Sequence, residues 1–390
     1  MKNGNGHAGG GVFGSPDRVM VRRALAEFRA GRPVMFSSAS ANFVITLPVD
    51  GLNVARLAAF KALCAPHAPK LVITARRADA LGVDAPGPVT LPLPPHAAPD
   101  AIYALVADAD AEPIDAGTVE PAGQSAIAAI ELAKLAQRLP ALLIGEAQSA
   151  SSALIDPPPL LVAAEAVAKF RQDAVNSLEV AGEARVPLQD GIDTRFVVFR
   201  DAVGGGSVAV VVGKPDLSRP VPVRLHSACL TGDVFGSSRC DCGDQLRLAL
   251  SRLKEEGGGI ILYLEQEGRG LGLANKMRAY ALQDMGLDTV DANTTLGFDD
   301  DERDYGVAAR MLQMLDCTRV ALLTNNPAKL DSLTDAGIEI SGRMPLNTPI
   351  NSDNRRYLTA KARRAGHLLD GVFAEAEAAE KREPGLVPPT

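Results

Sequence analysis

Short apolar runs alternate with amphipathic stretches along the second half of the chain. The runs "TRFVVFRD", "GSVAVVVGK", "PVPVRLHSACL", "GIILYLEQE", "RVALLTNN" and "IEISGRMPL" are rich in β-branched residues and are bounded by Gly or polar residues, which predicts strands. Apolar residues recur at helical spacing in "DQLRLALSRLKEEGGG", "LGLANKMRAYALQDMG", "ARMLQMLDC" and "PAKLDSLTDAG". The glycines that end the first of these helices predict a left-handed cap. This alternation predicts an α/β (α+β) domain with mixed sheets and helices.

The first half of the chain shows a similar alternation. "DRVMVRRALAEFRAG" and "QSAIAAIELAKLAQRL" predict helices, whereas "PVMFSSASANFVITLPV" predicts strands. Pro and Ser accumulate in "AQSASSALIDPPPLL", and the helical stretch "VAAEAVAKFRQDAVNSLEVAG" follows. These features divide the chain into five predicted parts. They are a flexible tail at 1–15, an α/β domain at 16–150, a linker region at 151–185, a second domain at 186–370 and a flexible tail at 371–390.

Length and composition agree with two globular domains and limit the partners. A chain of 390 residues exceeds the size at which a single core usually stops growing, and 46% hydrophobic residues suffice for ordinary cores. The net charge of −7 gives no general electrostatic reason to bind nucleic acid or anionic lipid. The Gly-rich N-terminus lacks the apolar core of a signal peptide, and no apolar run reaches the length of about 18 residues that a membrane span needs. We therefore expect a cytoplasmic protein.

Three of the five cysteines fall within the stretch "CLTGDVFGSSRCDC". Cys229, Cys240 and Cys242 lie among Gly, Ser, Asp and Arg, which are loop residues, so packing in a core explains them poorly. Thiols stay reduced in the cytoplasm, and soft thiolates in this spacing favour zinc. Three ligands with an open fourth position are typical of catalytic zinc. His226 could instead complete a closed site, or it could contact substrate.

Three further polar motifs follow predicted strands. "EQEGRGLG" at 265–272 is a Gly-rich turn without the Gly-Lys-Ser/Thr of a Walker A motif, although Arg269 and the helix N-terminus after it could hold an anion. "GFDDDERDYG" at 297–306 is explained equally well by a solvated loop and by a functional site. "LLTNNPAKL" ends a strand in polar residues, and open α/β sheets bind ligands at the carboxyl ends of strands.

Four stretches in the second half together resemble GTP cyclohydrolase II: "RLHSACLTGDVFGSSRCDCGDQL", "QEGRGLGLANKMRAYALQDMGLDTVDAN", "LGFDDDERDYG" and "LLTNNPAKL". The similarity runs from Val221 to His367 in the order of the family's motifs. It implies an enzyme that hydrolyses GTP at C8 of the imidazole ring and releases formate and pyrophosphate. The implied product is a 2,5-diamino-6-ribosylamino-pyrimidinone 5′-phosphate, and the reaction is the first step of riboflavin biosynthesis.

The resemblance also implies roles for individual residues. The three clustered cysteines would hold one zinc ion per chain. Asp301 matches the family's proton acceptor, Arg303 matches a residue that acts on the α-phosphate, and Tyr280 matches a tyrosine that positions water. Because an arginine side chain stays protonated, we expect Arg303 to stabilise charge in the transition state and not to act as a nucleophile.

The implied substrate contacts are spread over the same motifs. They are Arg224, Leu225, His226, Ser227, Ala228, Gln245, Glu267, Gly268, Arg269, Thr289, Thr324 and Lys329. A carboxylate such as Glu267 can accept hydrogen bonds from the N1–H and 2-amino groups of guanine, whereas Arg269 and Lys329 suit phosphates. Mg²⁺ would accompany the triphosphate, and the resemblance implies a homodimer.

Two positions depart from the family's common pattern. Many members have Glu before the first cysteine and Arg before "QEGRG", where this chain has Ala228 and Glu265. The departures leave open a related enzyme that opens a different ring, such as that of a uracil nucleotide in pyrimidine catabolism. A second alternative is a binding or regulatory protein without activity, but the retained cysteines, Tyr280, Asp301 and Arg303 argue against it.

Residues 17–145 resemble 3,4-dihydroxybutanone 4-phosphate synthase through "ALAEFRAGRPVMF", "RADALGV" and "AGQSAIAAIELAKLAQRLPALLI". In active members an acidic loop after the first strand binds a divalent metal, but here that stretch reads "SSASANFVITLP". The family's Gly-His-Thr-Glu signature reads Gly123-Gln124-Ser125-Ala126. Enolisation of a sugar phosphate needs a metal and an acid–base pair, so we expect this degenerate domain to be catalytically inactive.

Overall fold

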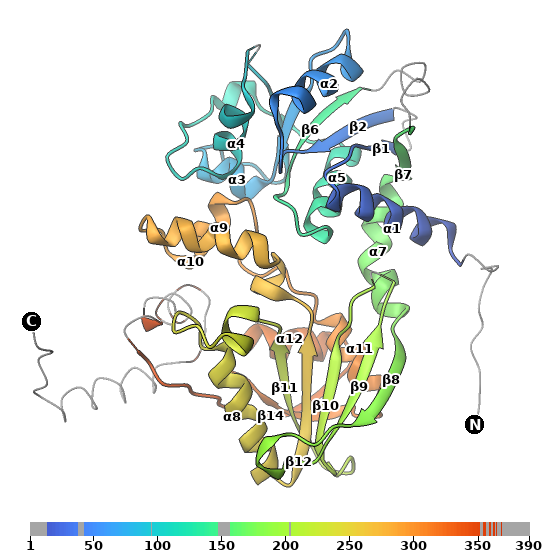
Figure 1. Cartoon of the computed structure of the whole chain (residues 1–390), viewed down its shortest axis with the longest axis vertical. Coiled ribbons are helices and arrows are strands. Elements are labelled where there is room, and N and C mark those ends of the chain that lie inside the picture. The colour runs from blue at the N-terminus through green and yellow to red at the C-terminus, as the bar shows by residue number, and fades with distance from the viewer. Residues whose placement is uncertain are drawn as a thin grey trace, which may run out of the picture. The chain divides into compact units, whose positions relative to one another are not determined.

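The computed structural model describes residues 14–37, 43–94, 96–146, 157–202 and 204–351, together with residues 354, 355, 359, 362, 364 and 368. Most of the predicted N-terminal tail, residues 38–42 of the stretch "SSASAN", residues 151–156 of the predicted linker and the predicted tail at 371–390 lie outside these residues. The predicted mixture of helices and mixed sheets is confirmed (Figure 1). Within the described ranges, no helix has the length and apolar character needed to cross a membrane.

The chain forms two compact units, each assembled from separate stretches of sequence. The first contains Met1–Ala174, Ala274–Leu287 and Asp291–Glu302, and the second contains Val175–Leu273, Asp288–Val290 and Arg303–Thr390. Two stretches of the predicted second domain therefore pack as part of the first unit. The predicted domain boundaries themselves stay a prediction.

The first unit is built on a sheet of seven strands, in the order β5-β4-β3-β6-β2-β1-β7. All neighbours are antiparallel except β1 and β7, which pair in parallel. The strands are β1 (Val34–Ser37), β2 (Phe43–Pro48), β3 (Lys70–Ile73), β4 (Val89–Pro92), β5 (Glu120–Pro121), β6 (Ala141–Glu146) and β7 (Leu160–Ala163). The helices of this unit are α1 (Pro16–Arg29), α2 (Val54–Cys64), α3 (Ala75–Ala80), α4 (Pro99–Ala107), α5 (Gln124–Leu135) and most of α7 (Ala164–Asn176), α9 (Leu273–Asp284) and α10 (Thr289–Thr295).

The second unit has another seven-stranded sheet, in the order β14-β13-β11-β12-β10-β9-β8. Its first four strands are parallel to one another, and the remaining pairs are antiparallel. The strands are β8 (Glu179–Arg185), β9 (Thr194–Arg200), β10 (Val208–Gly213), β11 (Val221–Ser227), β12 (Gly258–Leu264), β13 (Arg319–Leu323) and β14 (Glu339–Met344). Its helices are α8 (Cys242–Glu255), α11 (Gly306–Met314) and α12 (Pro327–Asp335).

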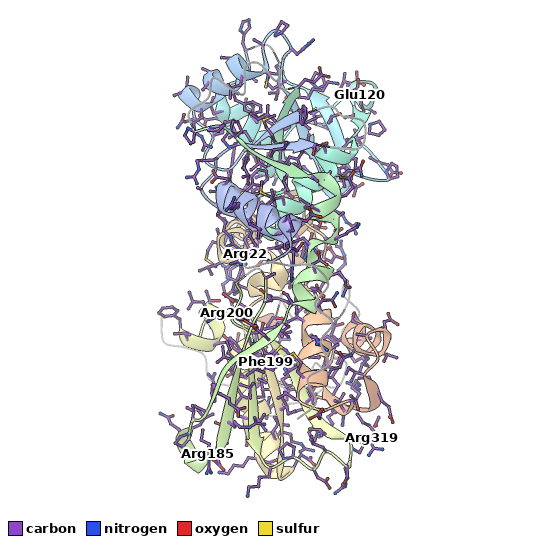
Figure 2. The ribbon with its side chains drawn as sticks, turned by 90° about the vertical axis from the view of Figure 1, so that its right-hand side faces the viewer. Arg22, Glu120, Arg185, Phe199, Arg200 and Arg319 are labelled. Atoms are coloured by element: carbon purple, nitrogen blue, oxygen red, sulfur yellow. The ribbon has the colours of Figure 1, made fainter. Side chains whose placement is uncertain are left out.

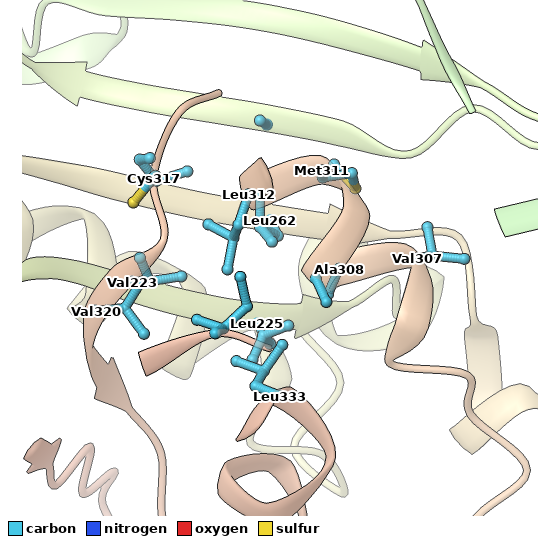
Figure 3. Close-up of a cluster of buried hydrophobic side chains, with 14 of the residues drawn as sticks. Val223, Leu225, Leu262, Val307, Ala308, Met311, Leu312, Cys317, Val320 and Leu333 are labelled. Atoms are coloured by element: carbon cyan, nitrogen blue, oxygen red, sulfur yellow. The ribbon is translucent and has the colours of Figure 1, made fainter. Parts of the chain in front are cut away.

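Alternation of side chains along the strands gives the second sheet two apolar faces. On β10, Val210 and Val212 pack with Leu253 of α8, whereas Ala209 and Val211 belong to the cluster on the other face. Figure 3 shows this second cluster, the one that contains Ala209 and Val211. In it, side chains of α11 and α12 meet those of β11 and β12. Because both faces are covered, the strands read as nearly continuous apolar runs in the sequence. The members of the second cluster labelled in the figure are Val223, Leu225, Leu262, Val307, Ala308, Met311, Leu312, Cys317, Val320 and Leu333.

The structure tests two predictions about the C-terminal ends of helices. The glycines after α8 were predicted to form a left-handed cap, and Gly257 confirms this with a φ of +80°. The helix predicted over 162–182 is wrong at its C-terminal end, because it stops at Asn176 and β8 begins at Glu179. Pairing with β9 outweighs the local helical pattern there. On β9 itself, Phe199 is fully buried and the next residue, Arg200, is exposed (Figure 2).

We predict that Gly259→Ala destabilises the second unit. A Cβ at this position of β12 would lie 2.5 Å from Leu253 Cδ2 and 2.6 Å from the carbonyl oxygen of Pro222. Relief of such overlap requires shifts of backbone, so we expect a loss of about 1–3 kcal/mol in the free energy of unfolding, measured by urea denaturation. Gly182→Ala in β8 is the matched control, because no atom lies within 4 Å of the added methyl group. Equal denaturation midpoints for the two variants would contradict the prediction.

Candidate metal and anion site

Three parallel strands of the second unit end at one edge of its sheet. β11 pairs in parallel with β12 on one side and with β13 on the other. Cys229 follows β11, Glu267 follows β12 and Thr324 follows β13. Neighbouring parallel strands present their carboxyl ends at the same edge, so this pairing gathers motifs that are far apart in the sequence.

The sulfur atoms of Cys229, Cys240 and Cys242 form a compact group. They come from the end of β11, from the following loop and from the first turn of α8, and all three lie within 4.8 Å of one another. The Sγ atoms of Cys229 and Cys240 are 3.5 Å apart, and the first two cysteines are buried. No disulfide joins these three cysteines, so all of them can act as ligands.

The surroundings of the sulfur group fit a metal ion. The backbone N–H of Gly232 donates to Cys229 Sγ at 3.3 Å, and that of Cys242 donates to Cys240 Sγ at 3.4 Å. Contact with the Cys229 thiol raises the pKa of Cys240 to about 11, and the two neighbouring thiols raise the pKa of Cys242 as well. Thiols this close keep their protons unless a cation balances the charge of the thiolates. Three thiolates are a donor set that zinc prefers.

Gly232 also leaves room for the sulfur group. A Cβ at this position would lie 3.1 Å from Cys229 Sγ and 3.2 Å from Cys240 Sγ. A larger residue would therefore press directly on two of the three sulfur atoms. The glycine in "CLTGDV" thus avoids a steric clash with the sulfur atoms, in addition to forming part of a tight turn.

Asp233 organises the turn that carries Cys229. Its carboxylate accepts hydrogen bonds from the backbone N–H of Cys229 at 3.0 Å and from the Tyr263 hydroxyl at 2.9 Å, and it lies 3.1 Å from Nε2 of His226. Burial, together with this carboxylate, raises the pKa of Tyr263 above its ordinary value.

His226 is a buried partner of Asp233 and not a member of the sulfur group. Among the described residues, the potential metal ligands that come together here are the three cysteines alone. Burial lowers the pKa of His226, although Asp233 opposes that effect, and the ring stacks on Tyr263 with centroids 5.5 Å apart. Its Nδ1 is buried without a hydrogen-bond partner in the described part of the chain. His226 thus lies outside the sulfur group, and its contact with substrate stays a prediction.

Arg224 is a buried cation beside this edge of the sheet. Its Nη1 donates to the carbonyl of Leu323 at 3.0 Å, and its Nη2 donates to Oε1 of Gln245. Gln245 in turn donates to the buried carboxylate of Asp241 at 2.6 Å. Within the described ranges Arg224 Nε is buried without a partner, and burial lowers the pKa of the guanidinium. A buried guanidinium with an unused donor is suited to an anionic ligand.

Two more cations gather at the ring of Tyr305. The guanidinium carbon of Arg303 lies 5.4 Å from the ring centroid, and Nζ of Lys329 lies 5.8 Å from it. Lys329 is buried and donates to the carbonyl of Leu225 at 2.9 Å, and Arg303 donates to Oγ of Ser227 at 3.4 Å. Cation–π contact helps to hold two positive charges near one another. The second unit therefore gathers positive charge at Tyr305 as well as at Arg224, which interacts electrostatically with Cys242.

The turn after β12 is tied to the cysteine loop. Glu267 accepts the backbone N–H of Leu230 at 2.6 Å and that of Gly268 at 3.1 Å. Gly268 and Arg269 both adopt left-handed conformations, with φ of 62° and 61°. The motif "QEGRG" thus forms a tight turn whose carboxylate is fixed by backbone donors. A carboxylate oxygen can accept a further hydrogen bond in addition to these.

The remaining predicted site residues are distributed over both units. Ala228 bonds through its N–H to the carbonyl of Leu264, and the buried Thr324 accepts the N–H of Asn326 at 3.0 Å. Thr289, at the start of α10, also belongs to the second unit. Tyr280 and Asp301 belong to the first unit.

The sequence reading missed Asp233, Tyr263 and Tyr305. Tyr263 is a polar interruption in the run "GIILYL", and Asp233 and Tyr305 stand inside motifs that were already of interest. A polar atom within an apolar strand needs a hydrogen-bond partner when it is buried, so the tyrosine in this run indicated that a polar partner lies nearby. The partners themselves come from other elements, so their identity required the structure.

Comparison with known proteins shows to which family the chain belongs. The GTP cyclohydrolase II family matches residues 179–345. The chain is 41% identical over 363 residues to GTP cyclohydrolase-2 of Azospirillum brasilense, covering 90% of this chain and 94% of that protein. It is 40% identical over 365 residues to GTP cyclohydrolase-2 of Xylella fastidiosa (strain 9a5c), covering 92% and 89%. The riboflavin biosynthesis protein RibBA of Bacillus mycoides is 40% identical over 282 residues, covering 70% and 69%. The chain belongs to the GTP cyclohydrolase II family.

Proposed function

We propose that this protein is a zinc-dependent GTP cyclohydrolase II. It would hydrolyse GTP to a 2,5-diamino-6-ribosylamino-pyrimidinone 5′-phosphate with release of formate and pyrophosphate, in the first step of riboflavin biosynthesis. The observation that carries the proposal is the group of three cysteine sulfurs within 4.8 Å of one another, in a chain of this family. Buried cations beside that group support a polyphosphate substrate.

The cysteine loop is suited to hold zinc before substrate binds. Cys229, Cys240 and Cys242 are the proposed ligands. Bound there, zinc would supply Lewis acidity and would lower the pKa of a water molecule. Asp233 fixes the backbone of Cys229, and the N–H of Gly232 fixes its sulfur, so the ligand set is oriented by its surroundings.

The triphosphate would meet Arg224, Arg303 and Lys329. Arg224 and Lys329 donate to backbone carbonyls, and Arg303 donates to the hydroxyl oxygen of Ser227. The positive charge of these three side chains would attract the phosphates. Arg303 is assigned to stabilise negative charge that develops at the α-phosphate, because a guanidinium does not lose its proton and is a poor nucleophile. Mg²⁺ would accompany the phosphates and offset their charge.

The remaining roles follow the family's motifs. Asp301 is the proposed proton acceptor, and Tyr280 is proposed to position the water molecule. Glu267, fixed by the Leu230 and Gly268 N–H groups, would accept hydrogen bonds from guanine. Further proposed substrate contacts are Leu225, His226, Ser227, Ala228, Gln245, Gly268, Arg269, Thr289 and Thr324.

The alternative substrate, a uracil nucleotide, rests on Ala228 and Glu265. Oε2 of Glu265 accepts the backbone N–H of Gly206 at 2.6 Å, in the connection between β9 and β10. This bond gives the departure from Arg a local structural reason. We therefore assign Glu265 to the support of a loop, so that its departure from Arg need not reflect a different substrate.

The first unit is proposed to lack synthase activity. At the positions of the missing signature, Gln124 opens α5 and donates to Glu165 at 3.1 Å, and Ser125 and Ala126 are buried. None of these side chains can transfer a proton to or from a sugar phosphate near neutral pH. We also propose that the protein is a cytoplasmic homodimer, as the family resemblance implies.

The zinc assignment predicts about one zinc ion per chain after dialysis. Cys240→Ser should lose most of that zinc, because it removes one of three thiolate ligands. Cys317→Ala is the matched control, since Cys317 lies in the apolar core of the second unit and outside the sulfur group. Elemental analysis provides the measurement. Equal zinc content in the two variants would exclude the cysteine site.

The substrate assignment predicts formate release from GTP and no ring opening of UMP. Purified protein is incubated with each nucleotide, and products are identified by mass spectrometry. Cys240→Ser should reduce formate release by at least about 1,000-fold, whereas Cys317→Ala should retain it. Ring opening of UMP without turnover of GTP would establish the alternative enzyme, and absence of both would favour a binding protein.

The intact chain should not convert ribulose 5-phosphate to dihydroxybutanone phosphate. The carboxylates of the acidic loop and the signature His and Glu are all missing from the sequence. Restoring the signature alone, with Gln124→His and Ala126→Glu, should also leave the protein inactive, because no metal-binding carboxylates are added. The product can be measured by coupled assay with Mg²⁺ present. Formation of dihydroxybutanone phosphate by the unaltered chain would refute the inactive-domain proposal.

A further inference from the structure

The stretch Asp291–Glu302 belongs to the first unit, although it is part of the cyclohydrolase family's sequence. It comprises most of α10 and a turn that ends in "GFDDDE". Asp301, the proposed proton acceptor, lies in this turn. The contacts of the turn within the first unit therefore bear on the proposed reaction.

The start of α3 binds the beginning of the turn. Arg77 is 2% exposed, and its Nη1 donates to the carbonyl of Thr295 at 2.9 Å. Its other three hydrogen bonds end on carbonyl groups at the C-terminal end of α4. The Thr74 hydroxyl donates to the carbonyl of Gly297 at 2.7 Å. Gly297 has a φ of +83°, and a Cβ there would lie 3.0 Å from Thr74 Oγ1, so the backbone approaches α3 closely.

Lys134 of α5 binds the end of the turn. Its Nζ lies 2.7 Å from Oε1 of Glu302 and 3.3 Å from Oδ2 of Asp299, and the Lys134 and Glu302 side chains are each 10% exposed. The same Glu302 oxygen accepts the backbone N–H of Asp299 at 3.0 Å, and Arg76 holds the other oxygen of Asp299 at 2.8 Å. In the sequence, Asp301 thus lies between Asp299 and Glu302, whose carboxylates are both held by Lys134.

The charges of this cluster depend on one another. Burial alone would lower the pKa of Lys134, but the carboxylates of Glu302, Asp299 and Glu131 together more than offset that effect and raise it. Burial likewise opposes ionisation of Asp299, yet Arg76 and Lys134 lower its pKa. Removal of the lysine would leave Glu302 as a buried charge without its cation. An uncompensated buried carboxylate reorganises its surroundings, and here the surroundings are the turn itself.

We propose that Lys134 is a positioning residue for the cyclohydrolase reaction, which together with Thr74 and Arg77 fixes the turn that carries Asp301. The inference rests on the proposed function. It gives the first unit, which lacks the acid–base residues of a synthase, the role of holding a residue that the proposed function uses. Lys134 acts through the backbone of the turn and has no assigned contact with substrate.

Steady-state kinetics of the full-length zinc enzyme provide the first measurement. Lys134→Met should reduce kcat for formate release about 10- to 100-fold, because small displacements of a reacting group cost this much. KM for GTP should change by less than about threefold, and Lys134→Arg should recover most of kcat. The matched control is Lys70→Met, which breaks the 2.6 Å pair of Lys70 with Glu120 in the same unit. We expect that control to retain the wild-type kcat.

Amide hydrogen exchange provides a second measurement that does not depend on turnover. Lys134→Met should accelerate exchange in residues 296–302, and Lys70→Met should not. Wild-type kcat in Lys134→Met overturns the proposal, as does a loss of kcat without faster exchange in the turn. If Lys134→Met unfolds the first unit, Glu302→Gln, which removes the ion pair while keeping the shape, is judged by the same two measurements. If the wild type does not turn over GTP, the proposed function fails, and exchange alone decides whether Lys134 fixes the turn.

Discussion

Parallel pairing of β11 with β12 and β13 is the constraint on which the site of the second unit depends. It places the ends of three strands side by side, and each strand end then continues into a different polar motif. The cysteine loop, the "QEGRG" turn and the "TNNP" segment meet because their strands meet. Bonds between these motifs, such as that from the Leu230 N–H to Glu267, then fix them against one another. A change of strand register would displace these three motifs relative to one another.

Much of this arrangement could be predicted from the sequence, because it depends on local patterns. Apolar runs gave the strands, helical spacing gave α8 and α11, and the glycines after α8 gave its cap. The spacing of the cysteines indicated a group of three ligands, which the structure brings together. The ordered motifs were specific enough to indicate the family. These features need no knowledge of which distant elements pack together.

What could not be predicted depends on long-range partners. The carboxylate of Asp233 meets Tyr263 and His226 only because β11 and β12 are neighbours. The helix predicted over 162–182 ends early for a similar reason, since β8 takes its conformation from β9. The bond between Thr74 and the Gly297 carbonyl joins residues 223 positions apart, and no pattern in either segment indicates the other. Sequence reading placed them in different domains.

The first unit is assembled from separate stretches of sequence, so it cannot complete its fold in the order in which the chain is synthesised. Its last stretch ends at Glu302, so residues 1–174 leave the ribosome well before the unit can close. Until α10 arrives, Arg77 and Thr74 have no carbonyl groups of Thr295 and Gly297 to bind, and Lys134 has no carboxylates. Domains usually fold as units in the order in which they are made. Here the part of the chain made first is completed by a part made much later, after most of the second sheet has been synthesised.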